Sequence, residues 1–159
     1  MPTTKLTSRL RRSRKSAIIV LAFVSAFSGI AATGCESLDT ERTEVISRIN
    51  ETRISQGLQP LRSNVVLSLK ADRWARQLRD LCDLKHSKLS DGAPKQWLKL
   101  GENVGYGGSI GIVHDAYLNS PGHRANILDP EFNQVGAAAV WGQCEGQTRV
   151  FTVQVFMKA

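Results

Sequence analysis

The sequence predicts one domain of the α+β class, in which the helices come first and the strands last. Apolar residues at helical spacing fill the middle of the chain, and two strand-like segments, Val135 to Trp141 and Arg149 to Met157, follow near its end. The glycine-containing residues 142–147 between them predict a hairpin turn. The length of 159 residues and the hydrophobic share of 42% fit one globular domain and exclude collagen-like and wholly disordered chains.

The N-terminal segment has the layout of a secretory signal. Basic residues crowd residues 1–15, an apolar run follows from Ala17 to Ala32, and small residues then lead to Cys35. We therefore assign residues 1–34 to a signal peptide. An uncleaved anchor is the weaker alternative, because the run is shorter than the about 20 apolar residues that a transmembrane helix needs. The export route stays open.

Most of the chain's excess of positive charge lies in this segment. The formal net charge is +7, but all 14 acidic residues lie from Glu36 onward, so the body of the protein is nearly neutral. A nearly neutral body has no polyanion-binding surface, and the sequence therefore predicts no nucleic-acid partner.

Cys35 is a candidate lipidation site. The segment 32–35 (ATGC) resembles a bacterial lipobox, except that Ala32 stands where leucine is usual. We expect a lipid on Cys35, a tether over residues 35–39 and a domain over residues 40–159; ordinary cleavage that leaves a free cysteine is the alternative. Cys82 and Cys144 then remain, and an even number of cysteines in an oxidising compartment predicts one disulfide, with a two-cysteine metal site as the poorly supported alternative.

The first helix is predicted to begin at a cap, Asp39 or Thr40, and to end at Gly57. Residues 58–61 include Pro60, which disfavours a helix, and are therefore predicted to be a connector to the second helix. The apolar positions expected to face the core are Val45, Ile46, Ile49 and, less regularly, Ile54.

A second helix is predicted from a cap at Ser63 or Asn64 to about Asp83. Three arginines, at positions 73, 76 and 79, lie mainly off its apolar stripe and predict a solvated basic face, with a site for an anionic ligand as the alternative. The stripe itself follows helical spacing closely: Leu67, Ala71, Trp74, Ala75, Leu78 and Cys82.

Residues 85–108 are predicted to form loops, because glycine and proline are frequent there. The run 105–111 (GYGGSIG) superficially matches a dinucleotide-binding loop, but Ile110 occupies the position of its last glycine and no predicted strand precedes it. We therefore predict no nucleotide site. A helix capped by Ser109 is expected to reach about Asn119, and another, capped by Ser120 with Pro121 in its first position, to reach Leu128.

Few residues of the chain are suited to chemistry. The short motifs of zinc proteases, serine hydrolases and P-loop enzymes are missing from the sequence. His86, Glu102 and His123 lie in loops or at a helix start, where a side chain can face a cleft, whereas His114 lies within a helix. A helix N-terminus disfavours imidazolium, so His123 is expected to be neutral and able to bind a metal; a structural hydrogen bond is its alternative role.

Three segments together resemble the bacterial branch of the CAP superfamily, named after cysteine-rich secretory proteins, antigen 5 and pathogenesis-related 1 proteins; its domain is also called SCP. These are residues 86–87 (HS), 101–107 (GENVGYG) and 119–128 (NSPGHRANIL), with Phe132 and Gly136 beyond them. Their order and spacing match, and the resemblance spans nearly the whole mature chain. It implies an α-β-α sandwich with a central antiparallel sheet and an open cleft.

The resemblance also implies a set of cleft residues. In the family, two histidines and two glutamates line the cleft, and in some members the histidines bind a divalent metal, often zinc. By position, the histidines are His86 and His123 and the first glutamate is Glu102, while Ser120 replaces the second glutamate. This departure weakens any mechanism that needs two carboxylates. Zinc held by two histidines alone would be bound weakly, since stable zinc sites use three or four protein ligands.

We expect an exported, lipid-anchored bacterial protein that acts at the cell envelope as a binding module for an unidentified envelope or extracellular partner. A metal-dependent hydrolase, with Glu102 as general base, is the enzymatic alternative. A carrier with a lipid as its ligand is the third hypothesis, and it would require an apolar groove between helices. The family has heterogeneous activities, and fold alone transfers none of them.

Overall fold

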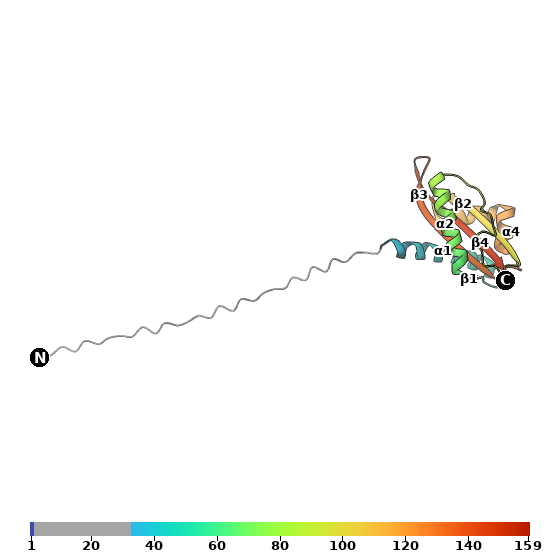
Figure 1. Ribbon diagram of the computed structural model, residues 1–159, viewed down its shortest axis with the longest axis horizontal. Helices are drawn as coiled ribbons and strands as arrows, with labels where there is room; N and C mark the ends of the chain where they lie inside the picture. The colour runs from blue at the N-terminus through green and yellow to red at the C-terminus, as the bar shows by residue number, and fades with distance from the viewer. Residues whose placement is uncertain (2–32) are drawn as a thin grey trace. The chain divides into compact units, whose positions relative to one another are not determined.

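The computed structural model describes Met1 and residues 33–159, with side chains from Thr40 onward. The signal-peptide prediction falls largely on residues 2–32, and the lipidation prediction on the Cys35 side chain; both lie outside the described part. The described residues form an α+β fold of four helices and one four-stranded sheet in the order β1-β3-β4-β2 (Figure 1). None of the described helices is both long and apolar enough to cross a membrane.

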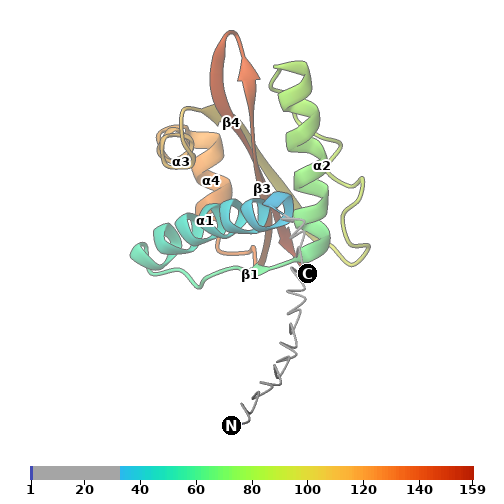
Figure 2. The same ribbon diagram turned by 90° about the vertical axis from the view of Figure 1, so that its left-hand side faces the viewer.

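The sheet lies between two helical layers (Figure 2). Helix α2 (Val65–Leu81) packs on one face, while α1 (Thr33–Ser55), α3 (Ile110–Asn119) and α4 (Pro121–Leu128) pack on the other. Each face has its own apolar core, because inward residues alternate along the strands: Ala137 and Ala139 join one core, Ala138 and Val140 the other. The expected α-β-α sandwich is therefore confirmed.

Strands β3 (Gln134–Cys144) and β4 (Gln147–Lys158) form the predicted antiparallel hairpin. Its turn places Glu145 and Gly146 at φ angles of 53° and 75°, the left-handed conformation that two-residue hairpin turns require. A short strand that the sequence did not predict, β1 (Arg62–Ser63), pairs parallel to β3 between the expected connector and α2. The sheet is thus mixed, although its three long strands are antiparallel as expected.

Strand β2 (Lys99–Gly107) corrects the prediction of a loop over residues 85–108. It pairs along its whole length with β4, from Lys99 opposite Lys158 to Gly107 opposite Val150. Its glycines serve close packing rather than turning: a Cβ atom at Gly101 would lie 2.8 Å from the Asn126 side chain, and one at Gly105 would lie 2.9 Å from the ring of Tyr117. The glycine content that predicted a loop is what lets α3 and α4 approach this strand.

The caps of the later helices agree with the sequence. Asn64 accepts a hydrogen bond from Leu67 N (3.1 Å) at the start of α2, and Ser109 accepts one from Ile112 N (3.2 Å) at the start of α3. Helix α4 starts with Pro121 as expected. Cys82 ends α2 in the left-handed conformation and forms the predicted disulfide with Cys144, with the two Cα atoms 5.4 Å apart.

Helix α1 begins earlier than predicted, whereas Gly57 follows its end as expected, in the left-handed conformation (φ 75°). The helix begins at Thr33, ahead of the expected cap at Asp39 or Thr40, so the backbone of the expected tether is helical. One predicted core position is wrong: Ile54 is exposed, whereas the neighbouring Arg53 is buried, with 1% of its surface exposed. The Arg53 guanidinium donates to the carbonyl oxygens of Gln59 (2.9 Å), Ile127 (2.8 Å) and Asp129 (2.9 Å). These acceptors explain why the charged residue faces inward and the apolar one does not.

Candidate functional site

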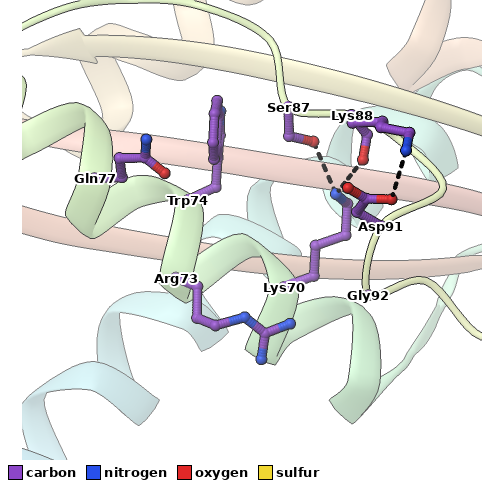
Figure 3. Close-up of a pocket in the computed structure, with 8 residues that line it drawn as sticks. All are labelled: Lys70, Arg73, Trp74, Gln77, Ser87, Lys88, Asp91 and Gly92. Carbon is purple, nitrogen blue, oxygen red and sulfur yellow. Dashed lines mark hydrogen bonds and ion pairs between the residues drawn. The ribbon is translucent and has the colours of Figure 1, made fainter.

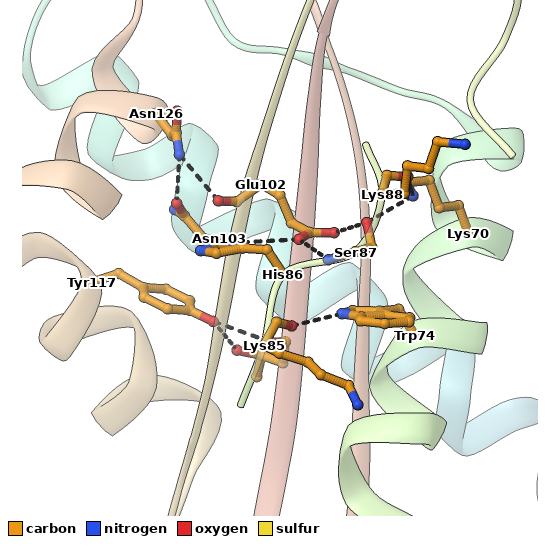
Figure 4. Close-up of polar contacts among 11 residues, drawn as sticks. Lys70, Trp74, Lys85, His86, Ser87, Lys88, Glu102, Asn103, Tyr117 and Asn126 are labelled. Carbon is orange, nitrogen blue, oxygen red and sulfur yellow. Dashed lines mark hydrogen bonds and ion pairs between the residues drawn. The ribbon is translucent and has the colours of Figure 1, made fainter. Parts of the chain in front are cut away.

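Glu102 is the centre of the candidate site. It lies in the middle of β2, opposite Val155 of β4, and is 5% exposed. Its Oε1 atom accepts a hydrogen bond from Ser87 N (2.8 Å) and lies 3.0 Å from Nδ1 of His86 (Figure 4). Its Oε2 atom accepts a hydrogen bond from Ser87 Oγ (2.5 Å). Both carboxylate oxygens of this buried residue therefore have partners in the segment 86–87.

The His86 ring is oriented by this carboxylate. Nδ1 faces Glu102, and the side chain of His86 is 60% exposed. When Nδ1 carries the proton, it donates to Glu102 and Nε2 keeps its lone pair. Carboxylates orient metal-binding histidines in this way in many metal sites. The arrangement leaves one nitrogen of an exposed imidazole available to a ligand.

Helix α2 holds the segment that carries His86. Trp74 Nε1 donates to the carbonyl oxygen of Lys85 (2.9 Å), and Lys70 Nζ donates to Ser87 Oγ (2.8 Å) and to the carbonyl oxygen of Lys88 (3.0 Å) (Figure 4). The loop thus has anchors on both sides of His86, and its position depends on polar side chains of α2.

His123 lies in the first turn of α4 and is half-buried. Its ring centroid is 4.9 Å from that of Tyr117, whose hydroxyl donates to the carbonyl oxygen of Thr152 (3.1 Å). Partial burial lowers the pKa of His123, and the positive charge of protonated His86 lowers it further. This effect favours the neutral imidazole that metal binding requires.

Two amide side chains, the buried Asn103 and the half-buried Asn126, connect the two histidine segments. Asn103 is 0% exposed, and its Nδ2 atom donates to the carbonyl oxygen of His123 (3.1 Å) and to Gln154 Oε1 (3.0 Å). Asn126 Nδ2 in turn donates to Asn103 Oδ1 (2.9 Å) and to the carbonyl oxygen of Glu102 (3.2 Å). Sequence reasoning assigned no role to either amide, although both lie inside the segments that carry the family resemblance.

Ser120 is placed at the junction of α3 and α4. It is the N-cap residue of α4 but makes no side-chain cap hydrogen bond; its backbone N donates to the carbonyl oxygen of Tyr117 at 3.2 Å. Hydrogen bonds therefore join His86, Glu102 and the backbone of His123 into one network, whereas Ser120 sits beside it at the helix junction.

The residues present suit a weakly held metal ion better than a closed metal centre. Among the residues described, no group of three or more histidine, cysteine, aspartate or glutamate side chains is arranged to hold a metal. Glu102 is occupied by its hydrogen bonds, which leaves His86 and His123 as nitrogen donors. Two imidazoles of this kind fit zinc or a similar divalent ion, with water in the remaining positions.

Comparison with known proteins establishes the family to which the chain belongs. The model of the cysteine-rich secretory protein family, CAP, matches residues 46–156. The chain therefore belongs to the CAP family. A curated relative, YkwD of Bacillus subtilis, is 30% identical over 121 residues, which cover 67% of this chain and 47% of the relative. The chain thus spans about half the length of that protein.

Solved structures agree on the fold. An outer surface protein of Borrelia burgdorferi matches with a TM-score of 0.62 and 20% identity, covering 73% of this chain and 90% of the other. An extracellular SCP-domain protein of Bacillus anthracis matches with a TM-score of 0.63 and 21% identity, covering 77% of this chain and 41% of the other. At these identities the likeness concerns the fold alone.

Proposed function

We propose that this CAP domain acts outside the cytoplasm as a binding module whose cleft takes a divalent metal ion, such as zinc, through His86 and His123. The observation that carries the proposal is the pairing of an exposed imidazole with a buried carboxylate, His86 with Glu102. The lowered pKa of His123 supports it, because the second imidazole is then neutral near pH 7.

The proposed location is the cell envelope, with a lipid on Cys35 as the anchor. The Cys82–Cys144 disulfide supports export, because disulfides persist in oxidising compartments. The fold neighbours described as an outer surface protein and as an extracellular protein support the same location. Metabolic labelling of the expressed chain with a fatty-acid analogue tests the anchor: we expect a label on the wild type and none on Cys35→Ser.

The contacts of Glu102 favour binding over hydrolysis. A general base needs a free lone pair to take a proton from water, but three of the about four lone-pair sites of this carboxylate face groups of residues 86 and 87, and the residue is 5% exposed. We therefore assign Glu102 a positioning role toward His86. The hydrolase hypothesis makes the opposite prediction, that Glu102→Gln removes an activity while the metal affinity stays intact.

Calorimetric titration of the untagged protein with zinc chloride tests the metal site. We expect heat of binding in the wild type and none in a His86→Ala/His123→Ala double variant. His114→Gln is the matched control, because it removes the one histidine that lies away from the cleft. The proposal would be refuted if the wild type gave no heat of binding with zinc, or if the double variant bound zinc as tightly as the wild type.

The same titration distinguishes the role of Glu102. If its carboxylate orients His86, Glu102→Gln weakens zinc binding by about 10-fold to 100-fold, as loss of such a partner does in other metal sites. An unchanged affinity together with the loss of a hydrolytic activity would favour the enzyme instead.

A further inference from the structure

A cleft that neither His86 nor His123 lines lies between α2 and the loop of residues 87–92 (Figure 3). Its volume is about 450 Å³. Lys70, Arg73 and Trp74 of α2 form one wall, and Ser87 and Lys88 belong to the other. Ser87 is shared with the candidate metal site, since its hydroxyl donates to Glu102.

Lys70 brings a buried positive charge to this cleft. The residue is 4% exposed, and its Nζ atom donates to Ser87 Oγ and to the carbonyl oxygen of Lys88. An ammonium group has three N–H donors, so these two bonds leave one donor over. Both acceptors are uncharged; the Glu102 and Asp91 carboxylates attract Lys70 through their charges but make no hydrogen bond to it. A buried ammonium without a direct anionic partner is costly, and an anion bound beside it would remove that cost.

Arg73 supplies a second cation without a partner. It follows Lys70 by three positions, so the two side chains lie on the same face of the helix. Among the described residues, Arg76 pairs with Asp72 (2.9 Å) and Arg79 with Asp80 (2.7 Å), whereas Arg73 makes no hydrogen bond or ion pair. Its guanidinium lies against the backbone of Gly92, at the edge of the cleft. Five N–H donors therefore remain available there.

The remaining charges of the cleft compensate each other. Lys88 Nζ lies 3.3 Å from Asp91 Oδ1, and both side chains are mostly exposed. The charges of Glu102 and Asp91 act on Lys70, but no carboxylate of the described residues is hydrogen-bonded to Lys70 or to Arg73. These two cations can therefore face a phosphate dianion together. The Trp74 ring also lines the cleft (Figure 3), and its Nε1 atom donates a hydrogen bond of 2.9 Å to the carbonyl oxygen of Lys85 (Figure 4). A fixed indole offers a flat apolar wall to whatever group carries the anion.

We propose that this cleft binds a phosphate monoester, with the phosphate between Lys70 and Arg73 and an apolar or aromatic substituent against Trp74. The Arg73 fork contacts two phosphate oxygens and the free Lys70 donor a third, as such side chains do in other phosphate sites. The site does not depend on a metal in the histidine cleft. It gives the domain a ligand class of its own, a phosphorylated small molecule or the phosphorylated end of a larger one.

Titration of the purified protein with phenyl phosphate, followed through its indole N–H resonances, tests the proposal. The chain has three tryptophans, and Trp74→Phe identifies the resonance of Trp74. We expect that resonance to shift saturably in the wild type, and the dissociation constant to rise by about tenfold or more in Arg73→Gln. Arg76→Gln is the matched control, because Arg76 lies one turn away and already has a carboxylate partner; its affinity should equal that of the wild type.

Three comparisons make the test decisive. Phenol carries the ring without the charge, and binding as tight as that of phenyl phosphate would overturn the proposal. Equal affinity for benzoate would overturn the assignment to a phosphate. An unchanged affinity in Arg73→Gln would place the ligand elsewhere. Zinc titration of Arg73→Gln separates the two sites, because we expect its zinc affinity to equal that of the wild type. The zinc proposal and the phosphate proposal can then fail independently of each other.

Discussion

The Asn103 side chain donates a hydrogen bond of 3.1 Å to the carbonyl oxygen of His123. Strand β2, which carries Glu102 and through it orients His86, therefore also holds the first turn of the helix that carries the second histidine. The two histidines are 37 positions apart in the sequence, yet a single buried amide connects their supports.

The first prediction concerns this amide. Asn103→Ala leaves the buried acceptors of His123 and Gln154 without their donor, and each unsatisfied buried group costs about 1–3 kcal/mol. We expect the free energy of unfolding in urea to fall by about 2–4 kcal/mol. Asn133→Ala, which removes an exposed hydrogen bond to the carbonyl oxygen of Ala159, should change it by less than about 0.5 kcal/mol. Equal effects of the two substitutions would contradict the role of Asn103.

Gly136 on β3 is predicted to tolerate no side chain. A Cβ atom there would lie 2.3 Å from the backbone of Leu67 and Ser68, so α2 would have to move away from the sheet. Gly136→Ala should destabilise the protein by about 1–3 kcal/mol or more in thermal or urea unfolding. Gly122→Ala is the opposite case, since its Cβ atom meets nothing within 4 Å and alanine favours the helix; we expect no loss of stability. A stable Gly136→Ala variant would show that α2 and β3 are less closely packed.

Because of His114, we expect the free energy of unfolding to fall as the pH falls. It is 6% exposed and its Nε2 atom lies 2.8 Å from Thr52 Oγ1; burial lowers its pKa below 6.5, and the positive charge of Arg48 lowers it further. Glu51 and Asp115 oppose the shift. The unfolded chain therefore binds more protons than the folded one as the pH falls through 6.5 toward the folded pKa, and protonation favours unfolding.

Urea unfolding at about pH 7.5 and about pH 5.5 measures this dependence. His114→Gln should lose less stability over this interval than the wild type does. The variant keeps His123, whose pKa is lowered in the same direction, so the difference between the two curves isolates His114. Parallel curves would show that His114 has no such effect.

The disulfide is predicted to contribute substantially to stability. Cys82 and Cys144 are separated by 62 positions, and closing a loop of that length restricts the unfolded chain by about 4 kcal/mol in the chain-entropy model. A Cys82→Ala/Cys144→Ala variant should lose stability of this order in urea unfolding. Reductant should destabilise the wild type to a similar extent and leave the variant unchanged; a variant that still responds to reductant would point to another bond.

Local signals in the sequence were sufficient for most of the helices. Asn64, Ser109 and Pro121 act within a few residues of themselves, so their effects on helix starts can be predicted without the fold. The burial of Arg53 could not, because two of its acceptors are carbonyl oxygens of Ile127 and Asp129, more than seventy positions away. The same holds for β2: only the neighbouring Tyr117 and Asn126 side chains explain why its glycines belong to a strand.

The residues of the candidate site could be predicted from the sequence, but the hydrogen bonds that hold them in place could not. His86, Glu102 and His123 followed from the family resemblance, and the structure joins the first two directly. The roles of Asn103 and Asn126 depend on partners in other elements, and those of Lys70 and Arg73 depend on a loop that folds back over α2. Local sequence patterns place Lys70, Arg73 and Asn126 as ordinary helix residues and Asn103 in a loop.

The bond between Cys82 and Cys144 has a consequence for maturation. Cys82 lies four positions before His86, so oxidation fixes the beginning of the segment that brings His86 to Glu102. In a reducing cytoplasm the thiols stay apart, and this end of the segment is held by α2 alone. Oxidation of Cys82 and Cys144 therefore adds a covalent support to the segment that carries His86, a support that the reduced protein lacks.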